Sequence, residues 1–131
     1  MAMTAHDLLA AARQVVPEVT PEQVHSGPAL AGRVLIDVRE RHEYESGHLP
    51  GAIHISKGYI EVLLEERVPD RETPITLYCA GGVRSLLAAE SVMRLGYVNV
   101  ESMAEGVGGW KANGYELVRE DKPLLGLARS A

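Results

Sequence analysis

The chain has 131 residues, which is enough for one domain of ordinary size and too few for two. Its single cysteine excludes an internal disulfide framework and any zinc or iron–sulfur site built from several cysteines. The formal net charge of −5 argues against nucleic acid as the main partner, because binding a phosphate backbone needs a basic face.

The N-terminal segment, MAMTAHDLLAAARQVV, does not look like a targeting signal. It lacks the basic start and the long apolar core of a secretory peptide. No stretch of the sequence approaches the roughly 18 apolar residues that a membrane-spanning helix needs. We therefore expect a cytoplasmic location and no membrane partner.

The first predicted helix follows Thr4, because the spacing of Thr4 and Asp7 is typical of a capping box. Apolar residues then recur at helical spacing until Pro17 ends the helix. We assign this helix to an N-terminal extension, residues 1–17. A second, short helix is expected after Thr20, since a proline at the first helical position and a glutamine at the third follow it.

Short apolar runs predict the strands. The run at 34–38 suits a strand that is covered on both faces, and the run at 74–78 predicts a strand with a proline at its start. The run at 52–55 is a weaker candidate, and 98–100 is a further short strand. Helical patterns lie between and after them, at residues 60–66, 85–95 and 109–112. Strands that alternate with helices predict an α/β fold with a parallel sheet and helices on both faces.

The only cysteine, Cys79, follows a predicted strand in the sequence CAGGVRS, and sites in parallel sheets form just past such strand ends. A thiolate is the reactive form of cysteine, and a free thiol has a pKa of about 8.5. Three features here favour the thiolate: the start of the next helix, the backbone N–H groups of residues 80–85, and the Arg84 cation. Gly81 and Gly82 can take positive φ, so consecutive amides can converge on an anion.

The position of Arg84 is informative by itself. A cation in the first turn of a helix opposes the helix dipole by a few tenths to about 1 kcal/mol. An anion between Arg84 and the loop amides would reverse that penalty. The alternative interpretation makes Cys79 a buried structural thiol followed by a glycine turn. The combination of Cys79, two glycines, Arg84 and a helix start favours a nucleophile.

Three ordered segments resemble the rhodanese (sulfurtransferase) family. They are LIDVRERHEYESGHLPGAIHI at residues 35–55, CAGGVRS at 79–85 and MAEGVGGW at 103–110. The segment VTPEQV at 19–24 is similar to the usual opening of the family. One departure is that Glu105 stands where the last signature usually has the first of two adjacent glycines. We expect that change to reshape a turn without touching a catalytic group.

The resemblance places a rhodanese-like domain at residues 18–118 and leaves residues 119–131 as a surface tail. It implies a five-stranded parallel sheet and a reaction that needs no metal or organic cofactor. Cys79 would be the catalytic residue: it would take a sulfane sulfur from a donor such as thiosulfate and pass it to cyanide, a thiol or a protein acceptor. The substrate-binding residues would be Arg84, Ala80, Gly81, Gly82, Val83, Ser85, Arg39 and Asp37.

Alternatives remain for several of these assignments. Asp37 and Arg39 form either a structural pair or a direct substrate contact. Ser85 is expected to cap its helix, to donate its hydroxyl to the bound sulfur, or both. Glu43 is expected to pair with an arginine, and His48 is expected to be a structural histidine rather than an acid or base. Whether the protein is a monomer or a homodimer stays open.

Loop length separates the possible activities. Four residues stand between Cys79 and Arg84, as in rhodaneses, whereas the related cell-cycle phosphatases and arsenate reductases carry one more. The spacing therefore favours sulfur over phosphate. A non-catalytic interaction module is the other alternative, but inactive relatives usually lack the cysteine. Because residues 80–83 carry no charge, the choice between thiosulfate and mercaptopyruvate as donor stays open, with thiosulfate the conservative expectation.

Overall fold

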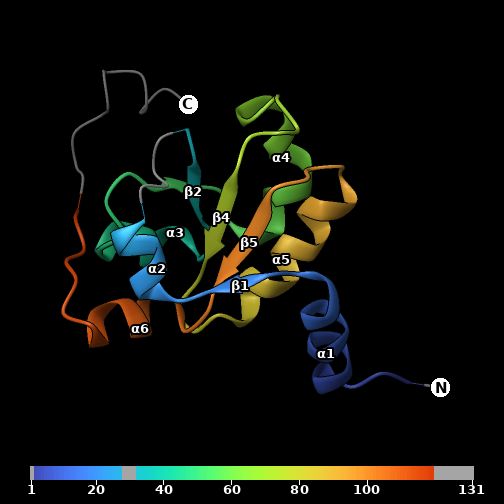
Figure 1. Cartoon of the computed structure of the whole chain (residues 1–131), viewed down its shortest axis with the longest axis horizontal. Helices are drawn as coiled ribbons and strands as arrows, with labels where there is room; N and C mark the ends of the chain where they lie inside the picture. The colour runs from blue at the N-terminus through green and yellow to red at the C-terminus, as the bar shows by residue number, and fades with distance from the viewer. Residues whose placement is uncertain (1, 28–31, 120–131) are drawn as a thin grey trace.

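The structure is a computed structural model that describes residues 2–27 and 32–119. It contains a five-stranded, wholly parallel sheet with the strand order β1-β5-β4-β2-β3 (Figure 1). The strands are β1 (Glu18–Val19), β2 (Val34–Asp37), β3 (Ile53–His54), β4 (Ile75–Tyr78) and β5 (Val100–Met103). The helices are α1 (Ala5–Val15), α2 (Pro21–Ser26), α3 (Arg41–Ser46), the short 3-10 helix η2 (Lys57–Tyr59), α4 (Ile60–Arg67), α5 (Val83–Arg94) and α6 (Gly106–Ala112).

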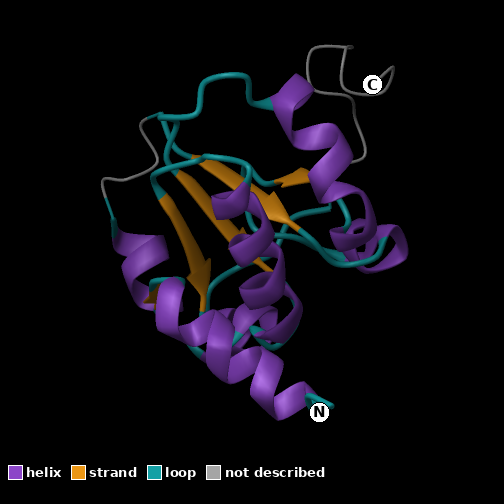
Figure 2. Cartoon of the chain, turned by 90° about the vertical axis from the view of Figure 1, so that its right-hand side faces the viewer, coloured by secondary structure: helices purple, strands orange, loops and turns teal. Residues whose placement is uncertain are grey.

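Helices cover both faces of the sheet, as predicted. In Figure 1, α1, α4 and α5 lie on one side of the strands, and α2, α3 and α6 lie on the other. Figure 2 looks onto the first of these faces. Side chains along β4 alternate between the two cores: Leu77 and Cys79 belong to the core under α5, whereas Tyr78 belongs to the core under α6.

Both predicted N-terminal caps are present. Thr4 and Asp7 exchange side-chain hydrogen bonds with each other's backbone at the start of α1, and a second capping box opens α2 at Thr20. The extension is not separate from the domain, because α1 buries Ala12 and Val16 in the same core as α5. The burial of these two side chains fixes α1 against the sheet's α5 face.

Several element boundaries differ from the prediction. The last strand was expected at 98–100 but runs over Val100–Met103, where it pairs with β4. Val98 was wrongly placed in this strand because it is apolar, but its side chain is 69% exposed and does not belong to the core. Three elements were not predicted: β1, which has only two residues, η2, which has three, and α3, whose polar sequence RHEYES buries no residue completely.

The last described residues return to the middle of the chain. Val118 pairs with His48 in an isolated antiparallel bridge. Apart from Arg119, the predicted tail at 119–131 lies outside the described residues. Within the two described ranges, each helix is too short or too polar to cross a membrane.

Candidate active site

The loop between β4 and α5 wraps its backbone around the sulfur of Cys79. The Gly82 N–H donates to Cys79 Sγ at 3.1 Å and the Ser85 N–H donates at 3.3 Å. Gly82 has φ +96°, and a Cβ there would lie 2.9 Å from the Glu105 nitrogen, so only glycine fits. The predicted convergence of loop amides is therefore present at the sulfur, although Gly81 does not take a positive φ.

Two opposing effects act on the ionisation of Cys79. Burial raises the pKa of the thiol, because the residue is 1% exposed. The Ser85 hydroxyl and the backbone N–H groups of Ser85, Gly82 and Gly81 lower the pKa, because they stabilise the negative charge on the thiolate. The hydrogen bonds prevail, so the pKa of Cys79 lies below its ordinary value. The loop thus favours a buried thiolate.

The first residues of α6 hydrogen-bond to the backbone of this loop. The Val107 N–H donates to the carbonyl of Cys79 at 2.9 Å, and the Gly108 N–H donates to that of Ala80 at 3.0 Å. Gly106 makes this approach possible, since a Cβ on it would lie 2.3 Å from the Cys79 carbonyl oxygen. The last signature segment is therefore a structural partner of the cysteine loop.

Arg84 is held by a carboxylate. Its Nη1 and Nη2 donate to the two oxygens of Glu43 at 2.9 and 3.2 Å, in a bidentate pair at the start of α5. The hydrogen bond from Arg84 is the main cause that lowers the pKa of Glu43 from 4.5 to about 2. The predicted pairing of Glu43 with an arginine is confirmed. Glu43 also supplies the anion that the cation in the first turn of the helix requires.

Asp37 and Arg39 form a buried ion pair. The Asp37 carboxylate accepts hydrogen bonds from the Arg39 guanidinium, its closest contact being 2.8 Å, and from the Tyr78 hydroxyl at 2.8 Å. Asp37 is 0% exposed and pairs in register with Tyr78, whose side chain lies on the opposite face of the sheet from Cys79. These contacts account for the pair structurally, and a direct substrate contact stays a prediction.

The other predicted site residues line the loop. Val83 is 45% exposed at the rim, and Ala80 is partly exposed. The expectation that Ser85 caps its helix is wrong, because α5 begins two residues earlier and Gly82 is its N-cap. Instead, Ser85 Oγ lies 3.4 Å from Cys79 Sγ, within hydrogen-bond range of a sulfur atom.

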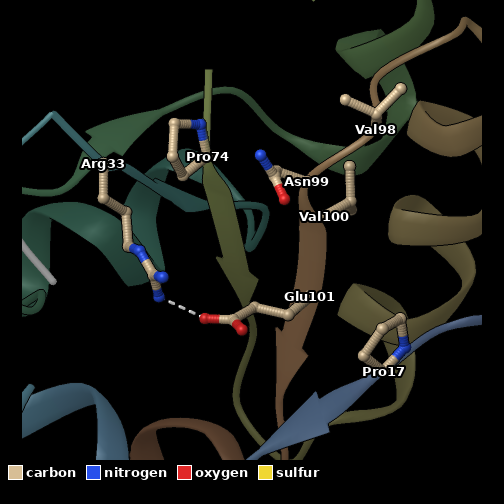
Figure 3. Close-up of a pocket in the computed structure, with 7 residues that line it drawn as sticks. All are labelled: Pro17, Arg33, Pro74, Val98, Asn99, Val100 and Glu101. Atoms are coloured by element: carbon tan, nitrogen blue, oxygen red, sulfur yellow. Dashed lines mark hydrogen bonds and ion pairs between the residues drawn. The ribbon is translucent and has the colours of Figure 1, made fainter. Parts of the chain in front are cut away.

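A hollow of about 290 Å³ lies at the opposite end of the sheet, near the amino ends of the strands (Figure 3). Arg33 in this hollow is bonded to Glu101 and Thr76, so its charge is already neutralised. Among residues 2–27 and 32–119, no group of three or more His, Cys, Asp or Glu side chains is arranged to hold a metal ion. The cysteine loop is thus the chemically distinctive site of the described structure.

Sequence reasoning missed one buried polar neighbour of the site. Ser102 on β5 is 0% exposed, and its Oγ lies 2.8 Å from Ser85 Oγ. Its signal in the sequence was weak: a small polar residue within VESM, a segment that was not predicted to be a strand beyond Val100. Only the pairing of β5 with β4 brings it beneath the loop.

The chain is similar to known proteins in sequence and in fold. A model of the rhodanese-like domain matches residues 20–113. The chain is 32% identical, over 80 residues, to the thiosulfate sulfurtransferase GlpE of Coxiella burnetii, which covers 61% of this chain and 73% of that protein.

Two solved structures share the fold. A thiosulfate sulfurtransferase from Pseudomonas aeruginosa is 28% identical with a TM-score of 0.78, over 90% of this chain and 23% of that one. A protein from Rhodopseudomonas palustris CGA009, described as a possible tyrosine phosphatase, is 25% identical with a TM-score of 0.78, over 90% of this chain and 96% of that one.

Proposed function

The chain belongs to the rhodanese-like domain family, and from this premise we propose that it is a sulfurtransferase with Cys79 as its nucleophile. It moves a sulfane sulfur from a donor such as thiosulfate to a thiophilic acceptor such as cyanide or a thiol. The observation that carries the proposal is the hydrogen bonding of Cys79 Sγ by the Gly82 and Ser85 amides at the start of α5. Such bonding favours the thiolate that the reaction needs.

The reaction has two steps. The Cys79 thiolate attacks the sulfane sulfur of thiosulfate, the sulfur–sulfur bond breaks, and sulfite leaves with the bonding electron pair. Cys79 then carries a persulfide anion. Cyanide attacks the outer sulfur, thiocyanate leaves, and the thiolate is restored. Negative charge stays at the loop throughout, so preformed amide donors stabilise both enzyme forms.

Glu43 and Arg84 set the charge at the edge of this loop. Arg84 favours an anionic donor, but both of its terminal nitrogens are bonded to Glu43. We assign the reacting sulfur to the loop amides and the sulfonate end of the donor to Arg84, which would have to exchange hydrogen bonds with Glu43 to bind it. Since Val83 is exposed at the rim and residues 80–83 carry no charge, a small donor meets little electrostatic resistance there.

The test is the rate of thiocyanate formation from thiosulfate and cyanide. The wild type should turn over and Cys79→Ser should not. Hydrolysis of an aryl phosphate is measured on the same preparations, because one structural relative is described as a possible tyrosine phosphatase. Phosphate release without thiocyanate would replace the proposal with a phosphatase, and neither product, with mercaptopyruvate also failing, would favour a non-catalytic module.

A further inference from the structure

Ser102 is a buried polar residue in a position that ordinarily takes an apolar one. It is 0% exposed on β5, and it pairs in register with Leu77 on β4. Parallel strands covered on both faces are usually apolar. A buried hydroxyl without a partner costs about 1–3 kcal/mol, so this side chain needs a hydrogen bond.

The hydrogen-bond partner of Ser102 is Ser85, which lies next to the sulfur of Cys79. Ser102 Oγ lies 2.8 Å from Ser85 Oγ, and Ser85 Oγ lies 3.4 Å from Cys79 Sγ. Ser85 is also 0% exposed, so both hydroxyls are shielded from water. The three groups therefore form a buried chain of hydrogen bonds from β5 to the sulfur.

Which group donates in each of these hydrogen bonds depends on whether the sulfur carries a proton. Each serine hydroxyl has one proton to donate and lone pairs with which to accept. When Cys79 is a thiol, its proton can point to Ser85 and the Ser85 proton to Ser102. When Cys79 is a thiolate, the Ser85 proton must point to the sulfur, and Ser85 can then accept the proton of Ser102.

We propose that Ser102 is a positioning residue, whose hydroxyl donates to Ser85 Oγ and so directs the single Ser85 proton at the Cys79 thiolate. Ser102 does not touch the sulfur and acts through Ser85 alone. The inference rests on the proposed role of Cys79 as nucleophile and adds to it a specific residue that sets the reactivity of the thiol.

The charged groups near the loop stay constant in the test. Arg84 on α5 interacts electrostatically with Cys79 and is bonded to Glu43 on α3. Glu105 stands at the start of α6, and the Asp37–Arg39 pair lies across the sheet. Replacing Ser102 alters none of these side chains, so a change in the ionisation of Cys79 would report the hydroxyl chain.

The experiment measures the rate of alkylation by iodoacetamide as a function of pH. Cys79 is the only cysteine, so the profile reports one thiol. Ser102→Ala should raise the pKa of Cys79 by about 0.5 to 1 unit, which lowers the thiolate fraction, and hence the rate below that pKa, about three- to tenfold. Ser85→Ala should raise the pKa at least as much. In the double variant, Ser102→Ala should add nothing, because the donor through which it acts is absent.

Two results would overturn the inference. One is an unchanged pKa in Ser102→Ala while Ser85→Ala shifts it. The other is an equal shift from Ser102→Ala in both backgrounds, which would assign the effect to packing. If Ser102→Ala does not fold, Ser102→Thr and Ser102→Val replace it: they share one shape, and only Thr should keep the wild-type pKa. Alkylation needs no sulfur transfer, so these results are independent of the thiocyanate assay.

Discussion

Gly106→Ala tests whether α6 supports the cysteine loop. A new Cβ would lie 2.3 Å from the Cys79 carbonyl oxygen and 2.6 Å from the Ala80 carbonyl carbon, and both are backbone atoms. The residue also has φ +52°, a region that costs a residue with a Cβ about 1–2 kcal/mol. Relief of the clash would break the hydrogen bonds from Val107 and Gly108, worth about 1 kcal/mol each. Together these effects predict a loss of about 3–4 kcal/mol in the free energy of unfolding.

The assay is urea unfolding, with the alkylation rate of Cys79 measured beside it. Gly81→Ala in the same loop is the matched control, because nothing lies within 4 Å of its Cβ position and its φ is not positive. That variant should stay within about 0.5 kcal/mol of the wild type or be slightly more stable. Gly106→Ala should also alkylate more slowly, since the loop amides move. The reasoning fails if Gly106→Ala unfolds like Gly81→Ala and alkylates like the wild type.

Three further predictions follow from the charged and strained residues. In Glu43→Gln, alkylation by iodoacetate relative to iodoacetamide should rise about three- to tenfold, because Arg84 loses its anion; Glu45→Gln, on the same helix, should leave this ratio unchanged. The pKa of Glu43 is lowered from 4.5 to about 2, so the ionised carboxylate stabilises the folded state fully above about pH 5. This stabilisation of the fold is lost as the pH falls toward 2. Because the pair is partly exposed, we expect the free energy of unfolding of the wild type to fall by up to about 1 kcal/mol over this pH range, a loss that Glu43→Gln does not show in acid titration. Glu105→Gly should stabilise the fold by up to about 1 kcal/mol, because Glu105 has φ +66°, whereas Ala104→Gly should destabilise it; equal thermal shifts in both would refute this.

Local patterns in the sequence predicted most of the scaffold. The caps at Thr4 and Thr20 need only residues three apart, and the apolar run that became β4 is recognisable from composition alone. β1 was not predictable, because two residues carry no periodicity and form a strand only by pairing with β5. β5 itself was misplaced because its polar residues, Glu101 and Ser102, have partners that only the tertiary structure supplies.

The candidate site was predicted in kind but not in detail. The glycines and the helix start predicted an anion loop around Cys79, and the sulfur is indeed hydrogen-bonded by amides. The sequence did not show that Arg84 is bonded to Glu43, which lies 41 residues away. Nor did it show that Gly106 contacts the loop, since that contact depends on the close approach of α6 to the carboxyl end of β4.

The most direct test of the Cys79 persulfide is an intact mass measurement. The purified protein is incubated with thiosulfate and its intact mass is measured by mass spectrometry; it is then treated with cyanide and its mass is measured again. We predict a gain of one sulfur atom that cyanide removes and that Cys79→Ser never shows. Reversal by cyanide is essential, because oxidation to a sulfinic acid gives a similar mass but does not reverse. A wild-type protein whose mass does not change, or whose gain survives cyanide, would contradict sulfur transfer from thiosulfate through Cys79.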